Sequence, residues 1–198
     1  EEGLLLFFYE AFEQKAMGLD PKDAGGFQVI YVPDPNQAEV VAEWPEDLPK
    51  VARFNPYPLA PQETVLLPPW DSLLIEDLHL DEEKQEAYEY LLDEIVDLEE
   101  WASRLILGGY PDQIQDDMTL DCELISAGMN VEDASVYEHP RVPELRQKAH
   151  EWRLLIQIPS SEERGMMWGD MGCLYFWIRE EDLKARRFDS SWMVMQCF

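Results

Sequence analysis

The fold predicted for this chain is decided by the stretch Gly172-Cys173-Leu174-Tyr175-Phe176-Trp177-Ile178. Successive side chains of a strand point to opposite faces of a sheet, and every residue from 173 to 178 is apolar or aromatic. We therefore expect a strand that other layers cover on both faces. One face would carry Cys173, Tyr175 and Trp177, and the other Leu174, Phe176 and Ile178.

Further strands are predicted outward from this stretch in both directions. A brief helix over 180–187 leads to a second buried strand over 192–197. The stretch 152–158 alternates so that Trp152, Leu154, Ile156 and Ile158 would lie on one side of a strand. Near the start of the chain, 3–9 and 27–32 are apolar runs of strand length. The sheets are therefore expected to be formed mostly by antiparallel strands from both ends of the chain.

The clearest helix is predicted over about 82–105. Its apolar residues recur at steps of three and four, which gives one continuous stripe. Asp81 is a plausible N-cap, and acidic residues in the first turn suit the positive end of the helix dipole. The stripe lasts fewer than four heptads, so packing across a sheet is favoured over a coiled coil. The stripe comprises Tyr88, Leu91, Ile95, Leu98, Ala102 and Leu105.

The remaining segments give weaker signals. Residues 33–69 are rich in proline, which excludes central strands, so only short edge strands over 51–54 and 63–67 are expected there. Trp44 and Trp70 are expected to pin this segment to the core, and a peptide groove lined by them is a further option. Residues 120–126 are predicted as a strand and 143–151 as a short helix.

Composition limits the classes of function. The chain has 198 residues and a formal net charge of −27, which works against binding nucleic acid or an anionic membrane. Such a surface favours a basic partner or simply a solvated exterior. The sequence contains no run of about 18 apolar residues, so no membrane-spanning helix is predicted. Three cysteines without metal spacing suit a reducing cytoplasm. We therefore expect a cytoplasmic α+β protein.

Motifs for catalysis or for cofactors are missing from the sequence. Neither pair of adjacent glycines stands in a phosphate-loop or dinucleotide frame, and no nucleophile elbow occurs. His79, His139 and His150 are scattered, and His150 is expected to end a helix. We therefore assign no catalytic residue, no metal and no cofactor, and lean against an enzyme.

Two loops contain candidate binding residues. Asp112, Asp116, Asp117 and Asp121 could supply oxygen ligands to Ca²⁺ or Mg²⁺, but their spacing is not that of an EF-hand, and a solvated turn is favoured. Glycines at 165, 169 and 172 allow tight turns around Trp168. Residues 166–168 therefore either form a binding loop or fill the core, and we favour the core role. The candidate ligand-binding residues are Tyr110, Asp112, Gln115, Trp168 and Asp170.

The chain contains an internal echo and a family resemblance. The strands over 3–9 and 172–178 share the frame Gly, any, Leu, any, Phe, aromatic, apolar. The stretches 108–118, 152–158, 166–186 and 196–197 together resemble the YwqG-like bacterial proteins of unknown function. The resemblance implies an α+β domain over 1–198 of two intertwined, similar halves, 1–80 and 81–198. It also implies an upstream segment before residue 1, and it brings no established reaction.

Two hypotheses of function follow. The first is a non-enzymatic binding module, of immunity type for example, whose acidic helix face attracts a basic protein. The second is an enzyme or small-ligand binder with a site near the 110–117 and 166–172 loops. The oligomeric state is not predicted. The acidic face of the first hypothesis comprises Glu82, Glu86, Glu89, Asp93, Asp97 and Glu100.

Overall fold

The computed structural model describes residues 3–37, 44–95 and 103–198. Its strands are β1 (Leu4–Tyr9), β2 (Phe27–Val32), β3 (Ile106–Leu107), β4 (Trp152–Pro159), β5 (Cys173–Arg179) and β6 (Trp192–Gln196). Its α-helices are α1 (Leu73–Glu76), α2 (Glu82–Ile95), α3 (Thr119–Ser126), α4 (Val142–Ala149) and α5 (Glu180–Ala185). Short 3₁₀ turns are η1 (Pro21–Gly25), η2 (Pro35–Gln37), η3 (Lys50–Ala52), η4 (Ala134–Glu138) and η5 (Phe188–Ser190).

The centre of the fold is an antiparallel sheet of order β3-β4-β5-β6. The sequence prediction for β5 is confirmed, because its residues from Cys173 to Ile178 are all buried. Cys173, Tyr175 and Trp177 belong to the core on one face of the sheet. Leu174, Phe176 and Ile178 belong to the core on the other face. The helix over 180–187 is confirmed as α5, and the strand over 192–197 as β6.

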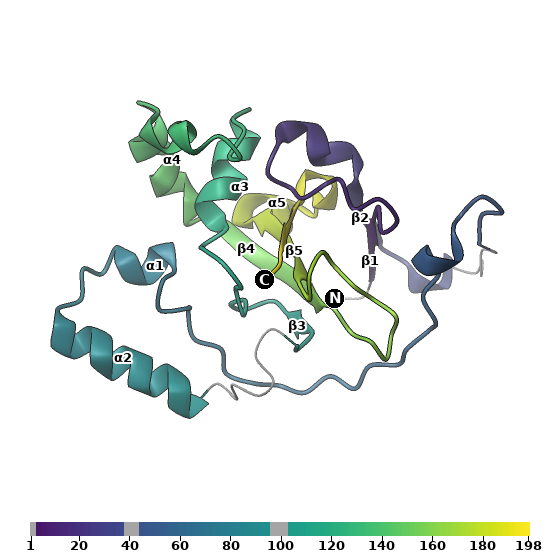
Figure 1. The fold of residues 1–198 in the computed structure, drawn as a ribbon, viewed down its shortest axis with the longest axis horizontal. Helices are drawn as coiled ribbons and strands as arrows, with labels where there is room; N and C mark the ends of the chain where they lie inside the picture. Colours follow the sequence, from purple (N-terminus) through teal and green to yellow (C-terminus); the bar gives the residue numbers. More distant parts are fainter. Residues whose placement is uncertain (1–2, 38–43, 96–102) are drawn as a thin grey trace.

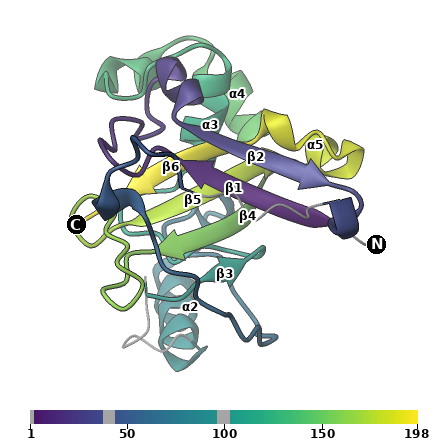
Figure 2. The same cartoon turned by 90° about the vertical axis from the view of Figure 1, so that its right-hand side faces the viewer.

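A two-stranded ribbon covers the Phe176 face of this sheet. β1 and β2 pair in antiparallel register, with Leu4 opposite Val32 and Tyr9 opposite Phe27. Figure 2 shows the ribbon as a layer in front of β4, β5 and β6. Phe176 packs edge-on against two ring systems of the ribbon, with centroid distances of 5.1 Å to Phe7 and 6.4 Å to Phe27. The predicted strands at the start of the chain are therefore confirmed.

The opposite face of the sheet is covered in part by α3. Met118 and Cys122 are buried there against Tyr175 and Trp177. The sequence prediction of a strand over 120–126 is wrong, because these residues form the helix α3. A short apolar run does not by itself distinguish a buried strand from a buried helix, which explains the error. The short helix predicted over 143–151 is confirmed as α4.

Strand β4 carries a register shift between Leu154 and Ile156. Trp152 and Leu154 contribute to the core that contains Trp177, whereas Ile156 packs against the core that contains Phe176. The prediction that 152, 154, 156 and 158 share one side is therefore wrong. An extra residue in one strand turns the following side chains to the opposite face, and periodicity alone does not reveal such a bulge.

Helix α2 begins as predicted but packs elsewhere. The Lys84 N–H donates to Asp81 Oδ1 over 3.1 Å, which confirms Asp81 as the cap. Within the described residues, α2 extends to Ile95. Two residues of the predicted stripe, Leu98 and Ala102, lie outside the described residues. Leu105 is described and is not helical. No α2 side chain is buried, and Figure 1 shows the helix apart from the four-stranded sheet. Packing of this helix across the sheet was therefore wrongly predicted.

Helix α2 contacts the proline-rich segment instead. The Tyr88 hydroxyl donates to the Pro68 carbonyl oxygen over 2.8 Å. Neither predicted edge strand forms, because 51–52 belong to η3 and 54–69 have no regular structure. Trp44 and Trp70 are about half exposed, at 52% and 51%, so the expectation that they pin this segment to the core is also wrong.

Helices and antiparallel sheets together confirm the α+β class. β1 and β2 come from the first expected half and the four-stranded sheet from the second, and they share the Phe176 core. The duplication of the two halves stays a prediction. Among the described residues, no helix is both long and apolar enough to cross a membrane.

The cysteine side chains are free thiols. Cys122 and Cys173 are buried, and Cys197 is partly buried. Burial raises the pKa of the Cys173 thiol to about 12 and that of Cys122 well above its ordinary value. Because the thiolate is the reactive species, these two thiols behave as small apolar groups of the core.

Candidate functional site

The loop over 108–118 is fixed to the sheet by polar side chains of β4, β5 and β6. Gln157 Oε1 accepts from the Asp112 N–H over 2.8 Å, and the Tyr175 hydroxyl donates to the Asp112 carbonyl oxygen over 2.8 Å. Gln196 Oε1 accepts from the N–H groups of Ile114 and Gln115 over 3.0 and 3.1 Å. Because these bonds satisfy backbone groups of the loop, they attach it to the strands beneath it.

Asp112 adds an ion pair to this attachment. Its side chain is 6% exposed and accepts from Arg104 Nε over 3.0 Å and from Arg104 Nη2. Gln157 Nε2 donates to the Arg104 carbonyl oxygen over 3.0 Å. Two-point contact between a guanidinium and a carboxylate fixes orientation as well as distance. The segment before β3 is therefore attached to the same strand as the loop.

A groove of about 400 Å³ lies between α2 and this loop. We call it the α2 groove. Apolar walls come from segment 65–70, from the end of α2 and from the loop itself. Asp71 and Asp93 also line it, and neither carboxylate pairs with a lysine or arginine among the described residues. Burial raises the pKa of Asp71, so its charge is poorly compensated. The residues used below are Leu66, Trp70, Asp71, Leu92, Asp93 and Tyr110.

A second cavity of about 450 Å³ lies between α1 and the β4–β5 face of the sheet. We call it the α1 cavity. It shares Pro69, Tyr110, Pro111 and Gln113 with the α2 groove, so the loop separates the two spaces. The residues used below are Ser72, Leu74, Tyr110, His150, Trp152 and Trp177.

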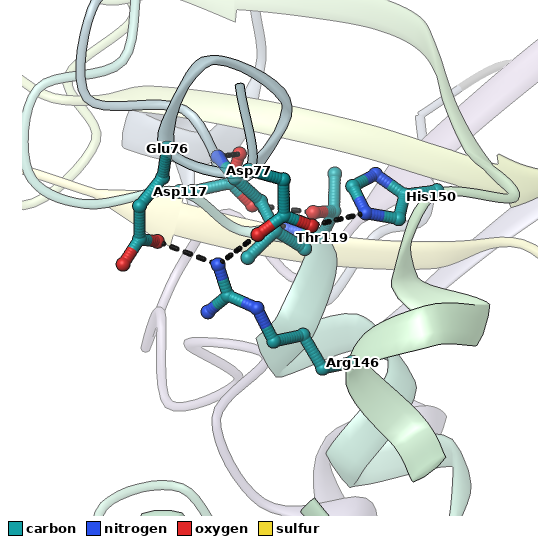
Figure 3. Close-up of polar contacts among 7 residues, drawn as sticks. Glu76, Asp77, Asp117, Thr119, Arg146 and His150 are labelled. Carbon is teal, nitrogen blue, oxygen red and sulfur yellow. Dashed lines mark hydrogen bonds and ion pairs between the residues drawn. The ribbon is translucent and has the colours of Figure 1, made fainter. Parts of the chain in front are cut away.

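Helix α1 closes one side of this cavity and is attached to α3 and α4 (Figure 3). The Leu73 N–H donates to Asp117 Oδ2 over 3.0 Å, and the other oxygen of Asp117 accepts from the Thr119 N–H over 2.7 Å. Asp77 accepts from Arg146 over 2.6 Å and lies 2.8 Å from His150 Nε2. Arg146 holds the pKa of Asp77 below its ordinary value. His150 ends α4 as predicted.

The structure separates the predicted ligand-binding residues into two groups. Tyr110, Asp112 and Gln115 line the α2 groove together. Trp168 is 3% exposed in the core on the other face of the sheet, where it packs edge-on against the rings of Tyr9 and Phe54. The exposed Asp170 accepts from the Phe198 N–H through its backbone.

The predicted core role of 166–168 holds for two of its three residues. Trp168 is buried, and Met166 packs partly buried against the same core, whereas Met167 is 42% exposed. Trp168 is held by ring contacts with Tyr9 and Phe54, whereas its indole nitrogen has no hydrogen-bond partner among the described residues. Its indole therefore reads as part of the core beneath the β1–β2 ribbon.

The predicted acidic face is solvent-exposed where it is described. Glu82, Glu86, Glu89 and Asp93 are exposed along α2. Asp97 and Glu100 lie outside the described residues. Lys84 is the single cation of α2, and it pairs with Asp81. The described part of α2 therefore presents carboxylates without compensating charge.

The aspartates of the 112–121 stretch do not gather into a metal site. Each of three has another role: Asp112 pairs with Arg104, Asp117 accepts from the N–H groups of Leu73 and Thr119, and Asp121 accepts from the Tyr137 hydroxyl over 2.6 Å. Asp116 is exposed to solvent. Within the described ranges, no group of three histidine, cysteine or acidic residues is placed to hold a metal ion.

Asp121 makes the fold sensitive to pH. Burial, with Asp117 and Asp116 nearby, raises its pKa from 3.8 to about 6. The folded state therefore binds a proton that the unfolded state has lost between these values, and stability falls as pH rises through this window. Asp121→Asn keeps an acceptor for Tyr137 without the charge. It is expected to stabilise the fold by about 2 kcal/mol at pH 8.

The matching measurement is thermal unfolding of both proteins at pH 8 and at pH 4. The stabilisation by Asp121→Asn is expected at pH 8 and should nearly vanish at pH 4, where Asp121 of the parent is protonated in the fold. Glu132→Gln, at an exposed carboxylate that does not contribute to the pKa shift of Asp121, serves as the control and should change little at either pH. A gain for Asp121→Asn that is equal at both pH values would contradict this assignment.

The architecture is that of an α+β domain whose two sheets and helical cover form continuous cores. The chain belongs to the family described as a domain of unknown function (DUF1963), whose model matches residues 1–197. No curated protein matches the sequence.

Several lining residues were not found from the sequence. Asp71, Ser72 and Trp177 come from segments that only the fold brings beside Tyr110. Trp177 was predicted as a core residue, which it is, and no sequence signal marks its indole nitrogen as unpartnered. Asp71 precedes a short helix in a proline-rich context, where an aspartate is usual and indicates nothing further.

Proposed function

We propose that this protein is a non-enzymatic binding module that takes a basic segment of a partner protein into the α2 groove. The observation that supports this proposal is the combination of apolar walls with two carboxylates that pair with no lysine or arginine among the described residues. Arg104 also lines the groove, but its side chain is paired with Asp112. A lysine or arginine side chain has the complementary build, with an apolar stem and a charged tip. We also propose that, within its family, the chain is one of the YwqG-like bacterial proteins that its sequence resembles.

The walls and the charges of the groove have separate roles. Leu66, Leu92 and Tyr110 would pack on the stem of the bound side chain. Asp71 and Asp93 would meet its charged tip, and the partly buried position of Asp71 strengthens that attraction relative to an exposed pair. The exposed carboxylates of α2 would accelerate the encounter more than they would hold the complex.

This arrangement unites two sets of predicted residues. Tyr110, Asp112 and Gln115 were predicted for a small ligand, and Asp93 was predicted for a basic partner. All four line the same groove. The geometry therefore favours one binding surface, on which Tyr110 supplies apolar contact and Asp93 supplies charge.

The proposal is tested by fluorescence anisotropy with a labelled twelve-residue peptide that alternates arginine and leucine. The double variant Asp71→Asn, Asp93→Asn is expected to weaken binding about tenfold, which corresponds to about 1.4 kcal/mol. Binding to the parent protein is expected to weaken as salt is raised, because exposed charges are screened.

A variant with the same net charge separates the groove from the general acidity of the chain. Glu46→Gln, Asp47→Asn removes two exposed carboxylates that do not line the groove. This control is expected to change affinity less than twofold. Equal losses in the two double variants, or binding that ignores ionic strength, would refute a specific role for the groove.

A further inference from the structure

Two residues that line the α1 cavity each contain a buried polar atom without a hydrogen-bond partner among the described residues. Ser72 and Trp177 are each 4% exposed, and both line this cavity. In the described part of the chain, neither Ser72 Oγ nor Trp177 Nε1 has a hydrogen-bond partner. A buried donor left without an acceptor costs about 1–3 kcal/mol, so two in one cavity indicate a position where an outside group is bound.

The other polar groups around the cavity are already engaged. Asp117 accepts from Leu73 and Thr119, and Gln113 Nε2 donates to Asp71 Oδ1 over 2.7 Å. Arg153 Nη1 donates to the carbonyl oxygens of His150 and Trp152, while its Nη2 pairs with Glu180. The charged groups are therefore matched within the protein, and the cavity offers no unmatched charge to an ion.

The walls between these groups are apolar. Leu74, Leu154, Tyr110 and Trp152 line the same space. The volume of about 450 Å³ lies in the ordinary range for a small-molecule site. An indole N–H only donates, so Trp177 requires an acceptor, whereas the Ser72 hydroxyl can donate or accept.

We propose that the α1 cavity binds a small uncharged molecule with an apolar ring and a hydrogen-bond acceptor, such as a carbonyl oxygen. The acceptor is held by Trp177 Nε1–H and by the Ser72 hydroxyl, and the ring lies against Leu74 and Tyr110. This site lies on the other side of the 109–113 loop from the α2 groove and does not depend on the basic partner.

The test uses three probes of one shape: acetophenone, its hydrocarbon analogue ethylbenzene, and benzoate. In spectra of the ¹⁵N-labelled protein, acetophenone is expected to shift the Trp177 indole N–H resonance downfield in a saturable way. Ethylbenzene lacks the acceptor and should bind about tenfold more weakly without that downfield shift. Benzoate should bind more weakly than acetophenone, because its charge would be buried without a partner.

Variants identify the groups involved. Trp177→Phe keeps a ring but removes the N–H, and Ser72→Ala removes the hydroxyl. Trp177→Phe is expected to weaken the binding of acetophenone about tenfold, and Ser72→Ala a few-fold. Trp44→Phe, at a tryptophan 52% exposed and outside the cavity, should leave the affinity unchanged.

Two results would overturn the proposal. One is that no probe moves the Trp177 resonance up to its solubility limit, which would assign the two groups to bound water. The other is that acetophenone and ethylbenzene bind equally well. Both results are obtained on the parent protein, so they remain decisive if Trp177→Phe does not fold.

Discussion

Phe176→Ala is expected to lower the free energy of unfolding by about 4 kcal/mol, among the largest losses that a single substitution in this chain would cause. Phe176 is 1% exposed in the central strand β5. Its ring packs against the ribbon, with centroid distances of 5.1 Å to Phe7 and 6.4 Å to Phe27. Strands hold it on both sides, so the surrounding structure cannot collapse into the space that the ring leaves.

The measurement is urea unfolding followed by tryptophan fluorescence. Phe8→Ala is the matched control, because Phe8 lies next to Phe7 in β1 but is 51% exposed on the opposite side of the ribbon. It is expected to cost less than about 1 kcal/mol. A loss below about 2 kcal/mol for Phe176→Ala would show that the ribbon does not depend on this ring for its packing.

The sequence predicted the parts of the fold in which burial and strand geometry agree. β5 is apolar at every position from 173 to 178, and a run of this length with β-branched and aromatic residues is typical of a strand covered on both faces. β1, β2 and β6 were found by the same reasoning. These strands do not depend on any distant residue for their recognition.

The errors have a different origin. The apolar residues of 120–126 fit either a strand or a helix, and Asp117, which accepts from the Thr119 N–H, is the signal that would have favoured a helix. The apolar stripe correctly predicted the helix α2 but not the segment against which it packs. Periodicity identifies an apolar face without identifying what covers it. The shift in β4 likewise leaves no trace in composition.

The candidate site was only partly predictable for the same reason. Tyr110, Asp112 and Gln115 lie close together in the chain, so one loop contains them, and they do share a groove. The groove and the cavity also need residues from 65–74, from α2 and from β5. Sequence alone places none of these beside the loop, and it placed Trp168 there although Trp168 fills the other core.

Asp112→Ala is expected to lower the free energy of unfolding by about 3 kcal/mol and to loosen the loop that separates the two binding spaces. The Asp112 carboxylate is 6% exposed and contacts Arg104, while its backbone is bonded to Gln157 and Tyr175. Removing a buried member of an ion pair usually costs 3–5 kcal/mol. The lower figure is expected because the Arg104 side chain is 21% exposed, so water can reach it.

Hydrogen exchange shows whether the loop itself loosens, because the N–H groups of Asp112, Ile114 and Gln115 are bonded to glutamines of the sheet. Their protection should fall in Asp112→Ala, and the arginine and leucine peptide should bind more weakly to the α2 groove. Asp112→Asn keeps the shape and loses the charge, so about half of the loss is expected. Asp116→Ala, four residues on and exposed, should stay within about 0.5 kcal/mol of the parent. If Asp112→Ala matched that control, the ion pair would not be what holds the loop in place, and its attachment would have to come from the bonds to Gln157, Tyr175 and Gln196.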